Sequence, residues 1–338
     1  MISLPTPSII PLRGGPAARW GVLGPGGIAE DWVSTVHRHT DQRVVAVASR
    51  SADRSRAFAS RHGIPRHYEG YDALLHDPDV DVVYIAAPHA QHHPLALATI
   101  AAGKHVLIEK PIALNTAQAE EIANAARAAG VFAMEAMWSR FLPQSHLIAQ
   151  LLADGELGDV RLATAHLGWQ WQYDPADRNF DPAAGGGVMI DAGVYSLWFA
   201  HSVLGAATTI TARGALAPTG VETEAVILLE NERGAHAAVS ASSTTTTPGL
   251  AAVYGSAGSV HFERSFVFPA QLRIAVGGDE IHWRDDSGLV GRDGLAWQAA
   301  AVASYLAEGR TQSPLHSLDD SLAVMRALDE VKRQIGSL

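Results

Sequence analysis

Three side chains that can take part in acid–base chemistry stand out from the sequence: Lys110, Asp191 and Tyr195. Lys110 follows an apolar run, and Asp191 and Tyr195 lie four residues apart in a stretch typical of a helix, so they share one face. A tyrosine titrates near a pKa of about 10, and a neighbouring ammonium group favours the phenolate. Such a pair can exchange the proton of a hydroxyl group while a hydride leaves its carbon.

We assign one role to each residue as a hypothesis. Tyr195 exchanges the substrate proton, Lys110 lowers the pKa of Tyr195 and polarises the substrate oxygen, and Asp191 positions Lys110 or a substrate hydroxyl. Lys110 itself could instead be the acid–base group, and the sequence does not separate these options. The structural alternative is a solvated lysine at a strand end and an ordinary contact on a helix face.

A G-x-G-x-x-A motif follows the first apolar run and opens a helical stretch. Gly24 permits a tight turn, Gly26 lets the backbone approach a pyrophosphate, and Ala29 allows close contact between helix and strand. The helix N-terminus offers N–H groups and a partial positive charge to phosphates. The motif therefore predicts a dinucleotide site that includes Gly24, Gly26, Gly27, Ile28 and Ala29.

The residues after the run Val44–Ala48 discriminate between the two nicotinamide cofactors. An NAD site places Asp or Glu here to bind the ribose diol, whereas this chain has Ser49 and Arg50, with Arg54 close behind. An arginine can pair with a 2′-phosphate and stack on adenine. The sequence favours NADP(H); NAD(H) remains possible if Arg50 only stacks on the adenine.

The order of predicted elements indicates two domains. Strands and helices alternate from Arg19 to about residue 136, which predicts an α/β Rossmann domain with a doubly wound parallel sheet. After an alternating stretch at Val160–Trp171 and a helix at Val188–Leu204, the chain reads as successive strands from Thr208 to about Ile274, which predicts an α+β domain with a large, mostly antiparallel open sheet. The predicted divisions are an arm (1–17), the Rossmann domain (18–140), the substrate-binding and oligomerisation domain (141–316) and a C-terminal helix (317–338) returning to the Rossmann domain.

Composition restricts the class of protein. The 338 residues contain 25 Lys plus Arg and 35 Asp plus Glu, a formal charge of −10, which argues against nucleic acid or an anionic membrane as partner. No cysteine is present, so disulfides, thiolate metal sites and cysteine nucleophiles are excluded, and a cytoplasmic location is expected. No apolar run approaches the roughly 18 residues of a transmembrane helix. The N-terminus lacks the pattern of a secretory signal and is expected to form an extended arm or a disordered tail.

Three motifs give the chain its resemblance to a known family. Glu109-Lys110-Pro111 follows Gly103–Ile108, a glycine-rich segment runs from Gly185 to Tyr195, and a third motif spans Met134–Pro143. Together they resemble the Gfo/Idh/MocA oxidoreductases over about residues 19–336. Many members have His where this chain has Tyr195. The Tyr form is similar to the branch of glucose–fructose oxidoreductase, dimeric dihydrodiol dehydrogenase and NADP-dependent xylose dehydrogenase.

The resemblance implies hydride transfer between NADP(H) and a sugar, polyol or related cyclic diol, a cis bond between Lys110 and Pro111, and a homodimer or homotetramer formed through the C-terminal sheet. It also places the loop containing His89 and His92 beside the nicotinamide; a polar loop with a helix N-terminal histidine is the alternative, and no metal site is expected. Aromatic faces and arginine forks suit polyols. The expected cofactor contacts are Gly24, Gly26, Gly27, Ile28, Ala29, Ser49, Arg50, Arg54, Ala87, Pro88, His89, His92, Glu109, Lys110, Trp138 and Arg140. The expected substrate contacts are Lys110, Trp138, Arg178, Asp191 and Tyr195.

Several functions remain open at this point. A ketoreductase acting on a modified or nucleotide-linked sugar would use the same residues. An oxidoreductase that holds its cofactor tightly and couples two sugars is a further option. A non-catalytic NADP sensor is the alternative from a different class, although a sensor has no need for Lys110, Asp191 and Tyr195.

Overall fold

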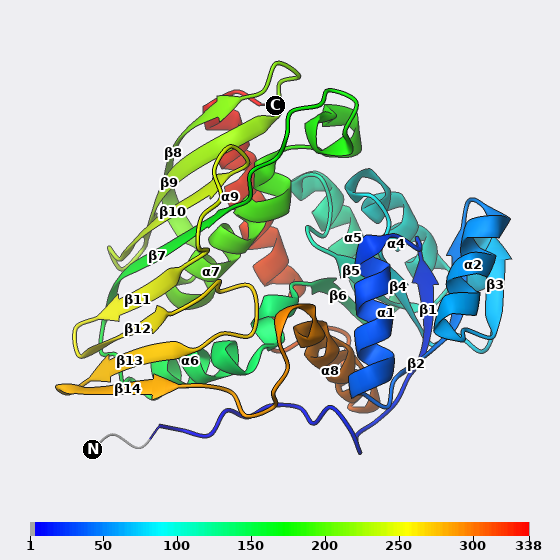
Figure 1. Cartoon of the computed structure of the whole chain (residues 1–338), viewed down its shortest axis with the longest axis horizontal. Helices are drawn as coiled ribbons and strands as arrows, with labels where there is room; N and C mark the ends of the chain where they lie inside the picture. Colours follow the sequence, from blue (N-terminus) through cyan, green and yellow to red (C-terminus); the bar gives the residue numbers. More distant parts are fainter. Residues whose placement is uncertain (1–3, 338) are drawn as a thin grey trace. The chain divides into compact units, whose positions relative to one another are not determined.

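The computed structural model describes residues 4–337 and divides into two compact units. The N-terminal unit comprises Ile10–Phe141 and Val290–Ser321. The C-terminal unit comprises residues 4–9, Leu142–Leu289 and residues 322–337. Figure 1 traces the chain through both units, each of which is described separately below.

The N-terminal unit is built on a six-stranded sheet in the order β3-β2-β1-β4-β5-β6, with every pairing parallel. This is the doubly wound order of dinucleotide-binding domains, and it confirms the predicted α/β fold. The inner strands are apolar and buried because helices cover both faces of such a sheet. The strands are β1 (Arg19–Leu23), β2 (Arg43–Ser49), β3 (Arg66–Glu69), β4 (Val82–Ile85), β5 (His105–Glu109) and β6 (Ala133–Ala136).

Local signals explain where the helices of this unit begin and end. The Ser51 side chain caps α2 by accepting a hydrogen bond from Arg54 N, and the Asn115 side chain caps α5 in the same way. Gly63 and Gly130 end these two helices in the left-handed conformation. The helices are α1 (Gly27–His39), α2 (Ala52–His62), α3 (Asp72–Leu75), α4 (His92–Ala101), α5 (Thr116–Ala129) and α8 (Leu295–Ala307).

The C-terminal unit contains an eight-stranded sheet in the order β14-β13-β12-β11-β7-β10-β9-β8 (Figure 1). Only the β7–β10 pairing is parallel, so the prediction of a large, mostly antiparallel sheet is confirmed. The strands are β7 (Val160–Gly168), β8 (Ala207–Leu216), β9 (Glu222–Asn231), β10 (His236–Ser242), β11 (Ala251–Gly255), β12 (Gly258–Phe262), β13 (Leu272–Val276) and β14 (Asp279–Trp283).

Helices α6 (Pro143–Ala153) and α7 (Val194–Leu204) contribute to the core of this unit. The Phe199 ring of α7 packs against Phe262 and Phe266, with centroids 5.7 and 5.5 Å apart. The stretch Pro182–Leu204 is long and apolar enough to cross a membrane, contrary to the expectation from the sequence. However, 83% of that window is buried inside the structure, as expected of a core helix.

The last helix, α9 (Leu318–Ile335), corrects one expectation. Its first turn, Leu318–Ser321, groups with the N-terminal unit as expected, whereas from residue 322 onward it groups with the C-terminal unit. The amide of Gln334 donates to Ile210 O at 2.7 Å and accepts from Ala212 N at 2.8 Å, so the helix is tied to edge strand β8. Helix α8, which lies within the predicted division 141–316, also groups with the N-terminal unit.

Candidate active site

The glycine turn between β1 and α1 has the geometry that a dinucleotide requires. Gly24 has φ +91°, and a Cβ atom on it would lie 3.0 Å from backbone atoms of Ala86 and Ala87, so only glycine fits. A Cβ on Gly26 would meet only Ala86 O, at 3.9 Å, and one on Gly27 would meet nothing within 4 Å. This side of the turn is open to a ligand. Ala29 is fully buried, as expected for close contact between helix and sheet.

The first turn of α1 leaves backbone donors for an anion. Gly26 is the N-cap and supplies no side-chain hydrogen bond to the helix. The first N–H groups of a helix have no partner within the helix, and together they favour a phosphate. The residues present therefore fit the pyrophosphate of a dinucleotide.

At the end of β2, the residues predicted to select the cofactor lie side by side in the sequence but differ in exposure. Ser49 is 4% exposed and its hydroxyl accepts from Ser51 N at 3.3 Å, whereas Arg50 is exposed. Arg54 donates to Pro25 O at 3.4 Å, which brings its guanidinium to the glycine turn. No carboxylate occupies the Ser49–Arg50–Ser51 segment.

Lys110 lies in a turn whose backbone is held by buried side chains. The peptide bond between Lys110 and Pro111 is cis, as the resemblance implied. Lys110 N donates to Glu109 Oε2 at 3.1 Å, and Glu109 Oε1 accepts from the Tyr84 hydroxyl at 2.5 Å. Burial raises the pKa of Glu109, against the hydrogen bond from Tyr84 and the charge of Lys110. Glu109 therefore has defined contacts within the turn, and its predicted contact with the cofactor stays a prediction.

The three histidines near this turn have different surroundings. His92 is fully buried, and its Nδ1 and Nε2 lie 2.8 and 2.9 Å from the carbonyl oxygens of Pro111 and Ala87. His92 thus links the turn after β4 to the turn after β5 and supports both. His93 pairs with Glu121 at 2.7 Å, and the partly exposed His89 ring stacks edge-on against His92. Among residues 4–337 no group of three His, Asp or Glu side chains is arranged to hold a metal ion.

The third motif forms a tight turn after β6. Trp138 is 5% exposed, and Arg140 donates from Nε to Leu315 O at 2.9 Å. Burial lowers the pKa of Arg140, although Tyr305 and Asp320 act in the opposite direction. Arg140 therefore holds the segment before α9, a contact that the sequence did not indicate.

The remaining predicted residues belong to the C-terminal unit. Asp191 lies in a π-helical turn, Met189–Gly193, and Tyr195 follows it at the start of α7 with 6% of its surface exposed. The glycine-rich entry is tightly packed, because a Cβ on Gly186 would come within 2.9 Å of the backbone at Arg178. Arg178 itself is exposed. Lys110 belongs to the other unit, so its approach to Asp191 and Tyr195 stays a prediction.

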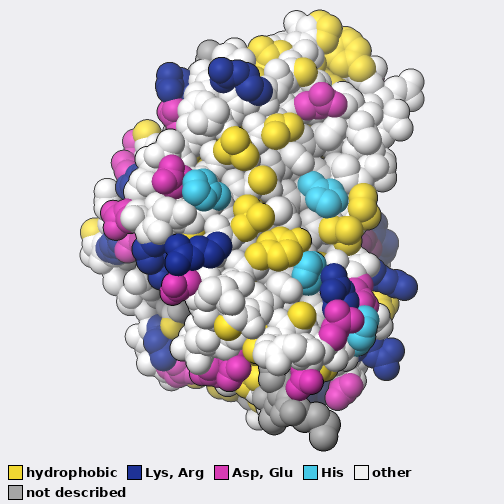
Figure 2. Space-filling view, turned by 90° about the vertical axis from the view of Figure 1, so that its left-hand side faces the viewer, with side chains coloured by type: hydrophobic (Ala, Val, Ile, Leu, Met, Phe, Trp, Pro, Cys, Tyr) yellow, Lys and Arg dark blue, Asp and Glu magenta, His cyan; other side chains and the backbone are white. Residues whose placement is uncertain are grey.

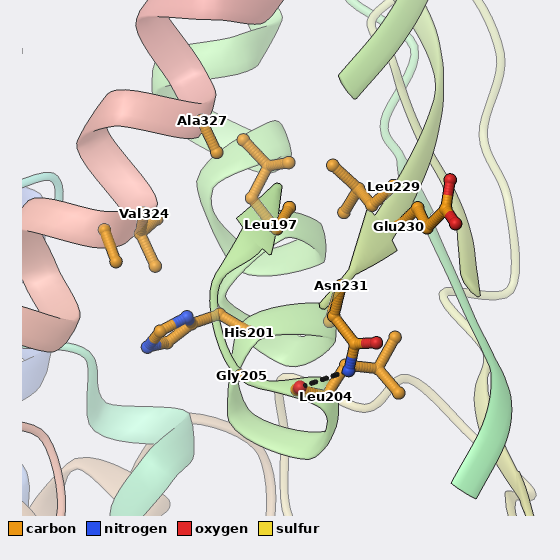
Figure 3. A pocket seen from close by; sticks show the side chains of 12 residues that line it. Leu197, His201, Leu204, Gly205, Leu229, Glu230, Asn231, Val324 and Ala327 are labelled. Atoms are coloured by element: carbon orange, nitrogen blue, oxygen red, sulfur yellow. Dashed lines mark hydrogen bonds between the residues drawn. The ribbon is translucent and has the colours of Figure 1, made fainter. Parts of the chain in front are cut away.

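A separate small cavity lies within the C-terminal unit, between α7, β9 and α9 (Figure 3). Its lining is mainly apolar, with Leu197 and Val324 among the side chains. Asn231 turns its amide to donate to Leu204 O at 2.8 Å. None of the predicted substrate residues lines this cavity.

One face of the large sheet exposes apolar side chains. Figure 2 shows hydrophobic side chains spread over this side of the molecule between polar ones. Along β9, Val226 and Leu228 are 63% and 57% exposed, while Ile227 between them is fully buried. The alternation is that of a sheet with one covered and one uncovered face. Other large hydrophobic side chains exposed in the unit are Leu162, Tyr173, Leu216 and Tyr254.

Comparison with known proteins covers both units. Residues 18–137 match a family described as oxidoreductases with an NAD-binding Rossmann fold, and residues 146–261 match the GFO/IDH/MocA C-terminal domain. The trans-1,2-dihydrobenzene-1,2-diol dehydrogenase of Mus musculus is 33% identical over 329 residues, which cover 95% of this chain and 97% of that protein.

Solved structures of similar fold match over nearly the whole chain. A 3-ketoreductase from Actinomadura kijaniata, in complex with NADP and TDP-benzene, has 28% identity and a TM-score of 0.82 over 96% of this chain and 98% of its own. An aldose-aldose oxidoreductase from Caulobacter crescentus has 25% identity and a TM-score of 0.84 over 95% and 97%. The chain therefore belongs to the Gfo/Idh/MocA family of NAD(P)-dependent oxidoreductases.

Proposed function

We propose that the chain transfers a hydride between NADP(H) and a hydroxyl or carbonyl carbon of a cyclic diol or related sugar. The main support is the similarity to trans-dihydrodiol dehydrogenase, which extends over 95% of this chain. The similarity covers both units, so it includes the glycine turn and the segments that carry Lys110, Asp191 and Tyr195.

The choice of NADP(H) rests on the end of β2. The segment Ser49–Arg50–Ser51 lacks the carboxylate that binds a ribose diol in NAD sites, and its exposed Arg50 can pair with a 2′-phosphate. Arg54, held at the glycine turn, adds a second positive charge. NAD(H) serves as the comparison cofactor in the assay below.

The proposed mechanism combines groups from both units. When bound, the nicotinamide supplies the chemistry of accepting or returning a hydride. In the oxidative direction the Tyr195 phenolate takes the hydroxyl proton as the carbon–hydrogen bond breaks, and in the reductive direction the phenol returns it. The Lys110 ammonium favours the phenolate and polarises the substrate oxygen. Asp191 orients Lys110 or a neighbouring substrate hydroxyl.

The test is a panel of trans-diols, aldoses, ketoses and inositols, followed at 340 nm with NADP and with NAD. We expect turnover of at least one diol or sugar, faster with NADP. Tyr195→Phe and Lys110→Met should each reduce kcat by about 10²-fold or more, with the affinity for NADPH within a few-fold of the wild type. Near-wild-type turnover in both variants would refute the assignment, and NADPH binding without turnover of any substrate would favour a sensor.

A second candidate follows from one structural neighbour. The 3-ketoreductase from Actinomadura kijaniata was solved with NADP and TDP-benzene, and it covers both units of this chain. This likeness supports reduction of a nucleotide-linked ketosugar as the alternative. A higher kcat/KM for a TDP-linked ketosugar than for any free diol would favour it.

We also propose that the chain is a cytoplasmic homo-oligomer, a dimer or tetramer, that associates through the uncovered face of its large sheet. The exposed Val226 and Leu228 form an apolar strip on this face. An uncovered apolar face of this kind marks an interaction surface. Sedimentation velocity at micromolar concentration should show a dimer or larger, and a monomer at every concentration tested would contradict the proposal.

A further inference from the structure

The turn that carries Lys110 is held at three consecutive backbone positions. Besides the bond from Lys110 N to Glu109 and the contact between Pro111 O and His92, Ile112 N donates to Glu135 Oε1 at 3.0 Å. Glu109, His92 and Glu135 are each at most 5% exposed. A turn held by buried side chains at three successive residues has little freedom to rearrange.

Glu135 differs from the other two because it is tied to a distant part of the chain. It lies on β6, within a strand that is otherwise apolar, and is 1% exposed. Its second oxygen, Oε2, accepts from the Ser321 hydroxyl at 2.7 Å and lies 2.9 Å from His316 Nε2. Ser321 and His316 are themselves 3.1 Å apart and nearly fully buried.

The segment that supplies these donors is anchored in turn. Ala133 N, on β6, donates to Thr311 O at 3.1 Å, and Arg140 Nε donates to Leu315 O. The Ser313 hydroxyl accepts from the backbone N–H groups of Leu315 and His316 at 3.1 Å. The chain after α8 is therefore fixed along β6, and it presents His316 and Ser321 to Glu135 in one arrangement.

Charge explains why a carboxylate is tolerated at this depth. Burial alone would raise the pKa of Glu135, but the hydrogen bonds from His316, Ser321 and Ile112 N together lower it. The carboxylate is thus kept ionised, and an ionised acceptor makes stronger hydrogen bonds than a neutral one. A buried carboxylate that is hydrogen-bonded at both oxygens specifies the geometry of its surroundings more strictly than apolar packing does.

We propose that Glu135, with His316 and Ser321, is a positioning group for Lys110. Glu135 accepts a hydrogen bond from the backbone N–H of Ile112, two residues beyond Lys110. It thereby limits the directions in which the lysine side chain can leave the turn. This inference rests on the proposed function, in which the Lys110 ammonium must stand beside the substrate oxygen. None of the three residues needs to touch substrate or cofactor.

The sequence offers an unusually direct probe. Lys104, Lys110 and Lys332 are its only lysines, so reductive ¹³C-methylation gives three lysine signals beside the N-terminal amine. Lys110→Arg removes one of them and assigns it. We expect Glu135→Ala to shift or broaden the Lys110 signal and to lower kcat about 10- to 100-fold, because small displacements of a catalytic group are costly. The affinity for NADPH should stay within about twofold.

Two variants separate positioning from a general loss of stability. Glu135→Gln keeps the acceptor for Ile112 N and offers its amide to the Ser321 hydroxyl and to His316 in its other tautomer, so it should restore the Lys110 signal and most of kcat. Ser321→Ala removes one donor and keeps the carboxylate on Ile112; we expect it to fold even if Glu135→Ala does not, and to lower kcat about threefold with a smaller shift of the same signal.

A matched control comes from the C-terminal unit. Glu222 is equally buried, and its Oε1 lies 3.7 Å from the Lys332 ammonium. Glu222→Ala should therefore move the Lys332 signal and leave the Lys110 signal in place.

Unchanged Lys110 signal and kcat in both Glu135→Ala and Ser321→Ala would overturn the proposal, even if both proteins melt at lower temperature. Should the wild type turn over no substrate in the panel, the proposed function fails. The Lys110 signal then still decides whether Glu135 fixes this side chain.

Discussion

Substitution of Gly24 and of Gly26, the two glycines that define the G-x-G-x-x-A motif, should affect different properties. Gly24 has φ +91°, and a Cβ there would press on three backbone atoms of Ala86 and Ala87 at 3.0 Å. A positive φ costs a residue with a Cβ about 1–2 kcal/mol, and the backbone contacts add to it. We therefore expect Gly24→Ala to lower the free energy of unfolding by about 2–4 kcal/mol.

For Gly26 we expect the opposite pattern, a small effect on stability and a large effect on NADPH binding. A Cβ at this position would meet the protein only at Ala86 O, 3.9 Å away, so the fold accommodates it. Because alanine is a weaker N-cap than glycine, the substitution should lower the free energy of unfolding by roughly 0.5–1 kcal/mol. The new methyl group would point into the open side of the turn, where a pyrophosphate must approach the backbone. We expect Gly26→Ala to weaken NADPH binding by about 10- to 100-fold, or roughly 1.4–2.8 kcal/mol.

The assay pairs a stability measurement with a binding measurement on the same ligand-free proteins. Urea denaturation gives the free energy of unfolding, and NADPH fluorescence titration gives the dissociation constant. Gly27→Ala is the matched control for stability, since a Cβ there meets nothing within 4 Å. Our reading of the turn is wrong if Gly26→Ala binds NADPH like the wild type, or if it destabilises the protein as much as Gly24→Ala.

Three further predictions concern other parts of the chain. Arg50→Ala should raise the KM for NADP about 10- to 100-fold by removing charge-assisted hydrogen bonds, with the KM for NAD nearly unchanged; equal effects on both cofactors would contradict the assignment. Leu228→Asp should convert the oligomer to a monomer in sedimentation velocity without loss of helix signal, whereas Thr211→Asp, at the exposed position opposite it on β8, should weaken association less. The lowered pKa of Glu135 means that its stabilising contribution is present above the ordinary carboxyl pKa of about 4.3 and is lost as the pH falls through the lower folded value. The free energy of unfolding should therefore fall more steeply below about pH 5 in the wild type than in Glu135→Gln, and parallel curves would count against an ionised Glu135.

Strong local patterns explain what could be predicted. The G-x-G-x-x-A motif specified its own turn because Gly24 is the residue type that the backbone there requires. The glycines at positions 63 and 130 marked helix ends for the same reason. Buried strands such as β4, with four apolar residues, were evident from composition alone.

Two strands were missed because their signal is weak. β3 consists of Arg66–Glu69 and β14 of Asp279–Trp283, both polar strands at the edge of a sheet. An edge strand buries little, so its sequence carries few apolar residues. β7 was predicted to extend to Trp171 but ends at Gly168, where a Cβ would come within 2.5 Å of Thr245 O. Trp169 and Trp171 therefore lie outside the strand.

The sequence by itself determined the order of the elements, the dinucleotide motif and the family, because each depends on residues that are close together along the chain. Only the tertiary structure brought Glu135, His316 and Ser321 into one buried cluster, and only it assigned most of the last helix to the large sheet. These contacts join residues more than 100 positions apart in the chain. A single charged residue in an apolar strand was the one visible sign of the cluster, since a buried carboxylate needs partners that local patterns do not name.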